Sequence, residues 1–206
     1  QLPALQWDYT PRYNIAPTQN VLTIINNRGK REPVLMRWGL IPYWAKDVMI
    51  GAKMINAREE TLTERVSFRN LVDRRRCIII ADGFYEWTSR GTTKIPMYIT
   101  LKNNAPFAMA GLWDIWQQPQ ELHGEPIHSC TIITTAANRT LSQIHTRMPV
   151  ILRPEDEDKW IGTARFNGLA SLFEPYPDNL LHYYQVSTLV NSPKNDFPEC
   201  IAKTNN

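Results

Sequence analysis

Seven short runs of β-branched and aromatic residues, separated by turn-forming residues, are the feature that most limits how this chain can fold. Asn-Asn-Arg-Gly at 26–29 and Ser-Arg-Gly at 89–91 are typical of hairpin turns, which predicts antiparallel pairing of the flanking runs. Because so many strands in a chain of this length favour a closed arrangement, we expect the sheet to curl or close. The runs cover residues 21–26, 33–39, 77–87, 96–102, 107–116, 130–136 and 148–152.

Helical segments are fewer, short and scattered between the strands. Pro154 is followed by four acidic residues, which suits the first turn of one of them because acids favour the positive end of the helix dipole. Scattered rather than strictly alternating helices indicate an α+β fold: a curled, mostly antiparallel sheet or barrel-like core with short peripheral helices. No linker-like stretch divides the chain, so we expect a single domain over residues 1–206. The predicted helices lie at 59–65, 67–73, 138–144, 155–161 and 166–173.

The composition is that of an ordinary globular protein. Hydrophobic residues make up 43% and charged residues 21%, and no uncharged apolar run approaches the ~18 residues of a membrane span. These values exclude a disordered chain and argue against a membrane partner. Lys and Arg exceed Asp and Glu by 23 to 20, and this net charge of +3 permits an anionic partner without requiring one.

Cysteine and histidine spacing predicts neither a disulfide framework nor a metal site. Cys77, Cys130 and Cys200 form no Cys-x-x-Cys pair, and Cys77 and Cys130 lie inside strand-like runs, where a thiol is usually a buried apolar group. His123, His128 and His182 belong to no recognisable pattern. We therefore expect no metal and no cofactor.

Two titratable residues lie in strings that mix polar and bulky neighbours. In ADGFYEW (81–87), strand alternation places Glu86 on the face of Phe84, where desolvation would raise the carboxyl pKa and suit it to exchange protons near neutral pH. A solvated glutamate at a strand end is the alternative. In IHTRMP (144–149), His145 lies at a helix-to-strand turn, a position that suits a proton-transferring imidazole, although a lone histidine can equally be structural.

Arginines and exposed aromatic groups in the remaining strings suggest contacts to nucleic acid. Asn56 and Arg58 in MINAR are two apart and would point the same way, and Arg147 and Arg65 lie beside related strings. Converging guanidinium groups bind phosphate oxygens, although a single surface arginine is by default solvated.

Trp44, in a stiff Ile-Pro-Tyr-Trp loop, and Pro17 could offer surfaces on which unpaired bases stack. The alternative for any tryptophan is core filling, which we expect for Trp38, Trp87 and Trp113.

Taken in order, eight strings resemble the SOS-response-associated peptidase family, whose members crosslink to abasic sites in single-stranded DNA. The resemblance runs from Tyr13 to about Glu199 and implies single-stranded DNA containing abasic sites as partner, and the cytoplasm, or the nucleoid in a bacterium, as location. The strings are YNIAP, RWGLIPYWA, INAR, ADGFYEW, GLWD, TIIT, IHTRMPVIL and VSTLVNSPKND.

The resemblance also implies a mechanism, in which the α-amine of an N-terminal cysteine attacks the aldehyde of the opened sugar and the thiolate closes a thiazolidine. Glu86 matches the family's acid/base residue, His145 its proton donor or acceptor, and Asn56 the asparagine that orients the terminal cysteine. The family's DNA contacts are matched by phosphate-binding and strand-unstacking positions. They are Arg58, Arg65, Arg147, Asn14, Pro17 and Trp44.

The cysteine that this mechanism needs is not among the 206 residues, because the amines of all three cysteines are locked in peptide bonds. We expect the native product to begin Met-Cys, ahead of Gln1. Two alternatives remain open: a peptidase limited to removing its own initiator methionine, and a noncatalytic single-strand binding module in which Glu86 and His145 are structural.

Overall fold

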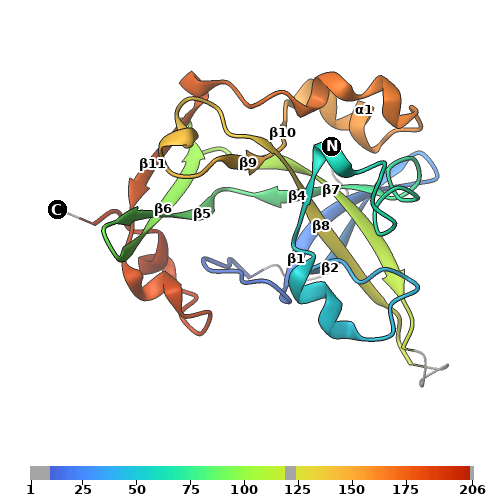
Figure 1. The fold of residues 1–206 in the computed structure, drawn as a ribbon, viewed down its shortest axis with the longest axis horizontal. Helices are drawn as coiled ribbons and strands as arrows, with labels where there is room; N and C mark the ends of the chain where they lie inside the picture. Colours follow the sequence, from blue (N-terminus) through green and yellow to red (C-terminus); the bar gives the residue numbers. More distant parts are fainter. Residues whose placement is uncertain (1–9, 119–123, 205–206) are drawn as a thin grey trace.

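Five strands of the computed structural model close into a barrel (Figure 1), within a structure that describes residues 10–118 and 124–204. β1 pairs with β2 and β4, β4 with β7, β7 with β8, and β8 returns to β2, so the ring is complete. Closure leaves no free edge around the ring, as the number of strands in the sequence predicts. The barrel strands are β1 (Asn20–Asn27), β2 (Lys30–Trp38), β4 (Arg76–Ala81), β7 (Phe107–Trp116) and β8 (Ile127–Ala136).

Three short strands extend the barrel sheet. β3 (Asn56–Arg58) runs parallel to β8, and β9 (Arg147–Pro149) runs antiparallel to the same strand. β10 (Ile151–Leu152) pairs with β7. The sequence predicts one strand over 148–152, but Val150 interrupts it by donating to Ile133 of β8 and accepting from Ala110 of β7.

A second sheet of three strands lies beside the barrel, at the left of Figure 1. It consists of β5 (Phe84–Arg90), β6 (Thr93–Leu101) and β11 (Leu181–Gln185), in the order β11-β6-β5. The sequence predicts one strand over 77–87; the chain bends at Asp82-Gly83 instead and passes from β4 to β5. A Cβ at Gly83 would lie 2.2 Å from the Tyr98 ring, so only glycine allows this close approach.

Both predicted hairpins are confirmed. Arg28 and Gly29 take positive φ angles of 53° and 85° between β1 and β2, as a two-residue turn with the strand twist requires. Gly91, with φ 61°, turns the chain between β5 and β6. Pairing is mostly antiparallel, as expected, and the parallel contacts are those of β2 and β3 with β8.

Strand alternation gives the described core two large clusters, beside which lie two smaller ones. Ile24 and Ile78 pack with Trp160 of the helix α1 (Glu157–Ile161). Cys77 of β4 and Cys130 of β8 belong instead to the cluster that contains Ile99 and Leu101 of the second sheet. Both thiols are buried, as expected, and burial raises the thiol pKa in each.

The predicted helices at 59–65, 138–144, 155–161 and 166–173 each contain short 3-10 turns, joined in the third by α1, whereas the helix predicted at 67–73 is wrong, because those residues form hydrogen-bonded turns. Segments of three to seven residues gain too few hydrogen bonds to offset helix nucleation, and packing on the barrel decides their geometry. None of the helices in the described part of the chain is long and apolar enough to cross a membrane. The 3-10 elements are η1 (Val48–Lys53), η2 (Glu59–Thr61), η3 (Leu141–Gln143), η4 (Pro154–Asp156), η5 (Phe166–Gly168), η6 (Ala170–Phe173), η7 (Asp178–Leu180), η8 (Thr188–Asn191) and η9 (Pro198–Ile201).

Candidate functional site

A carboxylate and an imidazole meet where the second sheet faces the barrel. Glu86 lies on β5, and His145 lies between η3 and β9, which pairs with β8. The His145 Nδ1 and Glu86 Oε1 atoms are 4.0 Å apart, and the two side chains are 47% and 30% exposed. The fold therefore brings together two residues that are 59 positions apart in the sequence, in a place open to an incoming ligand.

Burial raises the pKa of the Glu86 carboxyl above its ordinary value, as the strand alternation in ADGFYEW predicts. The His145 charge and the backbone N–H of Trp87, which donates to the carboxylate, oppose this rise but do not cancel it. A carboxyl with a raised pKa is partly protonated closer to neutral pH and can both donate and accept a proton.

The backbone of Arg147 orients the His145 ring. The Arg147 N–H lies 3.1 Å from Nδ1 and the Arg147 carbonyl oxygen lies 3.2 Å from the same atom. The ring nitrogen nearest Glu86 is therefore held by a backbone contact two residues along the chain.

Two of the arginines predicted to bind phosphate lie close together in the structure. Asn56 and Arg58 are both exposed on either side of the buried Ala57, as the alternation predicts, and Arg58 lies opposite Thr134 of β8. Arg147 donates to the hydroxyl and the carbonyl oxygen of the same Thr134, so Arg58 and Arg147 share one edge of the barrel.

Two predicted residues stay outside this cluster. Asn56 makes no side-chain hydrogen bond to any residue of 10–118 or 124–204. Arg65 is exposed in the turn after η2, and its hydrogen bonds among the described residues are all through its backbone: its N–H donates to Thr61 and its carbonyl oxygen accepts from Phe68 and Arg69.

The loop that carries Trp44 is exposed at its tip and tied down at its base. Tyr43 and Trp44 are 65% and 44% exposed, so core filling is wrong for Trp44. The Tyr43 N–H donates to the buried Asp114 at 2.9 Å, and the Trp116 ring N–H donates to the Ala45 carbonyl oxygen at 2.7 Å. This arrangement fits the predicted aromatic platform, and Pro17 is likewise exposed in the turn before β1.

The expectation that three other tryptophans pack is met by two of them. Trp38 and Trp113 are partly buried against the cluster that contains the cysteines. Trp87 is exposed, and its ring N–H donates to Asn191 at 2.8 Å. The reason is that β5 is an edge strand, and Trp87 lies on the opposite side of it from Glu86.

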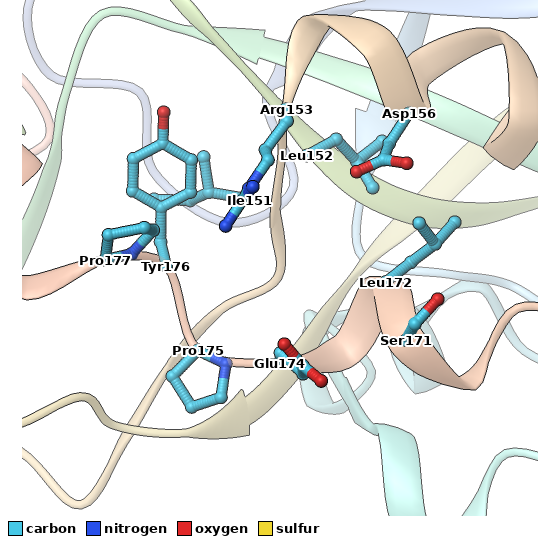
Figure 2. A pocket seen from close by; sticks show the side chains of 10 residues that line it. All are labelled: Ile151, Leu152, Arg153, Asp156, Ser171, Leu172, Glu174, Pro175, Tyr176 and Pro177. Atoms are coloured by element: carbon cyan, nitrogen blue, oxygen red, sulfur yellow. The ribbon is translucent and has the colours of Figure 1, made fainter.

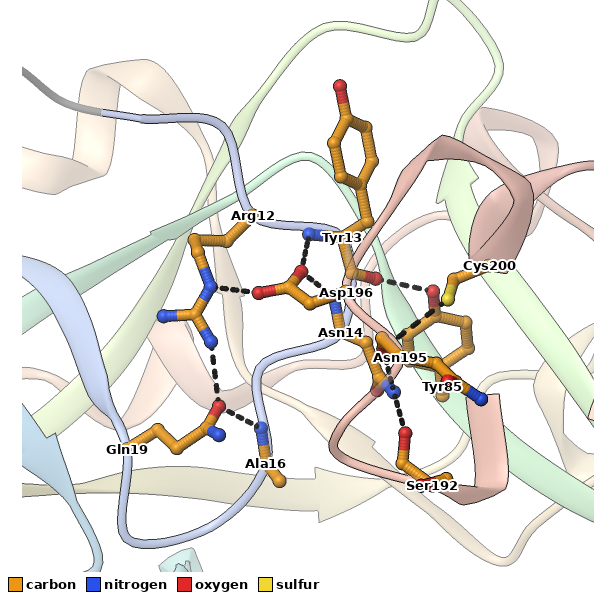
Figure 3. Close-up of polar contacts among 10 residues, drawn as sticks. All are labelled: Arg12, Tyr13, Asn14, Ala16, Gln19, Tyr85, Ser192, Asn195, Asp196 and Cys200. Carbon is orange, nitrogen blue, oxygen red and sulfur yellow. Dashed lines mark hydrogen bonds and ion pairs between the residues drawn. The ribbon is translucent and has the colours of Figure 1, made fainter. Parts of the chain in front are cut away.

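The side chain of Asn14, for which the sequence predicts a DNA contact, is buried within the fold. Its amide donates to the carbonyl oxygens of Val190, Ser192 and Asn195 at 3.0, 3.1 and 2.9 Å, and it is 5% exposed. Asp196 binds the same segment through the backbone N–H groups of residues 13 and 14 and through the Arg12 guanidinium (Figure 3).

Asp196 and Tyr85 were missed as site-supporting residues. The Tyr85 hydroxyl donates to the Tyr13 carbonyl oxygen at 2.6 Å, which fastens residues 12–14 beside the strand that carries Glu86 (Figure 3). The string VSTLVNSPKND, which contains Asp196, was the available signal, but pairing it with YNIAP required the fold.

The other histidines and a surface pocket contribute no residue to this site. The described residues contain no group of three or more His, Cys, Asp or Glu side chains arranged to hold a metal ion. His128 packs near Trp113 and His182 lies beside the Thr100 hydroxyl, whereas His123 is outside the described residues. A pocket of about 180 Å³ between β10, η6 and residues 174–177 (Figure 2) is lined by none of the predicted site residues.

The raised pKa of Glu86 predicts a stability difference between the wild type and Glu86→Gln. Because the folded state holds this proton more tightly than the unfolded chain, the wild type loses stability as pH rises from the ordinary glutamate pKa of about 4.3 to the raised folded value. The variant has no carboxyl at this position and does not lose stability in this way. The difference between the free energies of unfolding of the variant and the wild type should therefore increase in favour of the variant as the pH rises across this window. Urea denaturation at pH steps from about 4 to about 8 measures the difference; a difference that stays constant with pH would contradict the burial argument.

The chain matches one protein family and is similar to several curated proteins and solved structures. The family model described as SOS response associated peptidase (SRAP) matches residues 3–193. The abasic site processing protein YoqW of Bacillus subtilis (strain 168) is 52% identical over 94% of this chain and 87% of its own length. The abasic site processing protein HMCES of Gallus gallus is 33% identical over 94% of this chain and 66% of its own. A solved structure of a protein from Bacteroides thetaiotaomicron superposes with a TM-score of 0.77 at 32% identity, covering 94% of this chain and 82% of that one.

Proposed function

Because the chain belongs to the SOS response associated peptidase family, we propose that it binds abasic sites in single-stranded DNA and captures them covalently through an N-terminal cysteine. The names of its relatives, abasic site processing proteins, support the substrate. The observation that carries the proposal is the Glu86–His145 pair, 4.0 Å apart and joined through Arg147 to an edge that bears two arginines.

The proposed chemistry begins with the abasic sugar, which exchanges between a ring-closed hemiacetal and an open aldehyde. The α-amine of the cysteine adds to the aldehyde carbon, and the resulting hydroxyl leaves as water to give an imine. The thiolate then adds to the imine carbon while the nitrogen takes up a proton, which closes a thiazolidine. An α-amine is suited to this because its pKa of about 8 leaves more of it unprotonated at neutral pH than a lysine amine of about 10.4.

Glu86 and His145 supply the proton transfers in this scheme. Glu86 takes the proton from the sugar hydroxyl as the ring opens and returns one to the hydroxyl that leaves as water, for which its raised pKa is suited. His145, whose ring is oriented by the Arg147 backbone, can act as the second proton carrier. Asn56 would orient the terminal cysteine, Arg58, Arg65 and Arg147 would hold the flanking phosphates, and Pro17 and Trp44 would unstack neighbouring bases.

The Tyr85 hydroxyl donates to the Tyr13 carbonyl oxygen, which holds residue 13 against β5, the strand that carries Glu86. Removal of an initiator methionine, the self-processing reaction also proposed here, would expose the amine and is measurable as the loss of one methionine in the intact mass.

The test is incubation of the full-length protein, carrying the proposed Met-Cys start, with an abasic oligonucleotide, followed by denaturing electrophoresis. A heat-stable band of lower mobility should form with the wild type and be lost when the second codon is changed from Cys to Ala. Noncovalent affinity for an undamaged strand should fall steeply with salt, because phosphate contacts release counterions. A band that survives the Cys change, or no band with the wild type, would refute covalent capture through that residue.

A further inference from the structure

The Arg147 guanidinium is held in place by Thr134 alone on its inner side. Its Nε donates to the Thr134 hydroxyl at 3.1 Å and one Nη2 hydrogen donates to the Thr134 carbonyl oxygen at 2.6 Å. The side chain is only 19% exposed. Its orientation therefore does not depend on any group at its outer, Nη1–Nη2 edge.

A carboxylate of the chain occupies that outer edge. The two Glu60 oxygens accept from Nη1 at 2.7 Å and from Nη2 at 2.9 Å, the parallel two-bond geometry with which arginine also binds a phosphate. Four of the five guanidinium hydrogens are then in use, one on Nε, one on Nη1 and two on Nη2. Arg147 cannot bind a phosphate with this edge while Glu60 remains there.

Glu60 also faces the second predicted phosphate contact. The hydrogen bonds from Arg147 lower the pKa of its carboxyl most, and the charges of Arg147 and Arg58 lower it further, so Glu60 lies within the field of both arginines. The adjacent Glu59 is directed elsewhere, toward the Thr135 hydroxyl at 3.4 Å. The Glu60 side chain is 50% exposed, so it can leave the arginine for solvent without breaking packed contacts.

We propose that Glu60 is a specificity-determining residue that occupies the phosphate position at Arg147 and must be displaced by the DNA backbone. This inference rests on the proposed function. Displacing Glu60 from Arg147 costs free energy. For an undamaged strand only the reversible contacts with the protein can offset this cost, whereas a strand with an abasic site is also retained by the covalent bond. Glu60 would therefore weaken binding to undamaged single strands more than it reduces the final yield of crosslink.

The test compares Glu60→Gln with Glu64→Gln, a matched control at an exposed glutamate in the turn after η2. Affinity for an undamaged oligothymidylate of roughly 15 nucleotides is measured by fluorescence anisotropy. Glu64→Gln reports the effect of one lost negative charge, and Glu60→Gln should bind about fivefold more tightly than this control, the amount expected for releasing a partly exposed ion pair. The abasic crosslink yield at long times should be the same in both variants.

A double-mutant cycle assigns the effect to Arg147. In an Arg147→Gln background, adding Glu60→Gln should change affinity no more than adding Glu64→Gln does. Equal affinities of the two single variants, weaker binding by Glu60→Gln, or a gain that persists without Arg147 would each overturn the inference. A wild-type protein that binds no single-stranded DNA would instead refute the proposed function, so the two failures are distinguishable. Thermal melting of each variant confirms that it is folded.

Discussion

Replacing Glu86 by Gln should slow formation of the covalent adduct by at least about 100-fold while leaving single-strand affinity nearly unchanged, since a positioned acid/base group typically contributes about 10²–10⁴-fold. The amide matches the carboxyl in size and keeps an oxygen for the Trp87 N–H, but it cannot accept or release a proton at any working pH. Single-turnover kinetics with an abasic oligonucleotide, followed on denaturing gels, measure the rate directly.

The pH profile separates this chemical role from a structural one. In the wild type, the rate should depend on the ionisation of a carboxyl whose pKa lies above the usual glutamate range, and the Glu86→Gln profile should lack that step. Glu64→Gln serves as the control, because it removes a carboxylate at an exposed position in the turn after η2. A variant rate within about twofold of the wild type would favour the alternative in which Glu86 and His145 only support a binding module.

Opposite effects on stability and on rate are expected from the same substitution. Burial makes the ionised Glu86 unfavourable for folding, so the variant should be the more stable protein above the raised pKa and yet the slower crosslinker. A carboxylate retained at a cost to stability is more readily explained by chemistry than by packing.

Much of the barrel was predictable because its strands are long and carry strong β-propensity. All seven predicted runs contain strands, and the turn residues at 26–29 and 89–91 identify both hairpins. The short strands β3 and β11 were missed, since three to five residues carry no periodic signal and both depend on partners distant in sequence. The break at Asp82-Gly83 was missed for a similar reason: the Tyr98 ring that requires a glycine there belongs to another strand.

The direction of several candidate side chains was predictable from the sequence, whereas the contacts between them were not. Strand alternation identified the faces of Glu86, Asn56 and Arg58, because a period of two fixes side-chain direction locally. The occupation of Arg147 by Glu60 joins residues 87 positions apart and depends on how β8, β9 and η2 meet. The same limit explains Asn14, whose polar character suggested a surface contact although its partners lie more than 170 positions away.

Replacing Asn14 by Ala should lower the free energy of unfolding by about 2–4 kcal/mol, because three carbonyl oxygens of the C-terminal segment lose their donor. The amide has two hydrogens for three acceptors, so two acceptors share one hydrogen. The expected loss of stability is therefore smaller than the sum for three separate hydrogen bonds. For a domain of this size the loss corresponds to a fall in melting temperature of about 5–15 °C. Asn70→Ala, at an exposed position in the turns before β4, should shift the melting temperature by no more than about 2 °C.

The same variant decides between an anchoring role and a DNA contact for Asn14. If the residue anchors residues 12–14 against Val190, Ser192 and Asn195, Asn14→Ala should leave the salt dependence of single-strand binding unchanged while it slows covalent capture, because the N-terminal segment is no longer held beside β5. Melting curves, salt titrations and adduct kinetics on one preparation measure all three quantities. A variant with wild-type melting and weakened DNA binding would restore the DNA contact that the sequence suggested, since loss of a surface contact to DNA costs no stability.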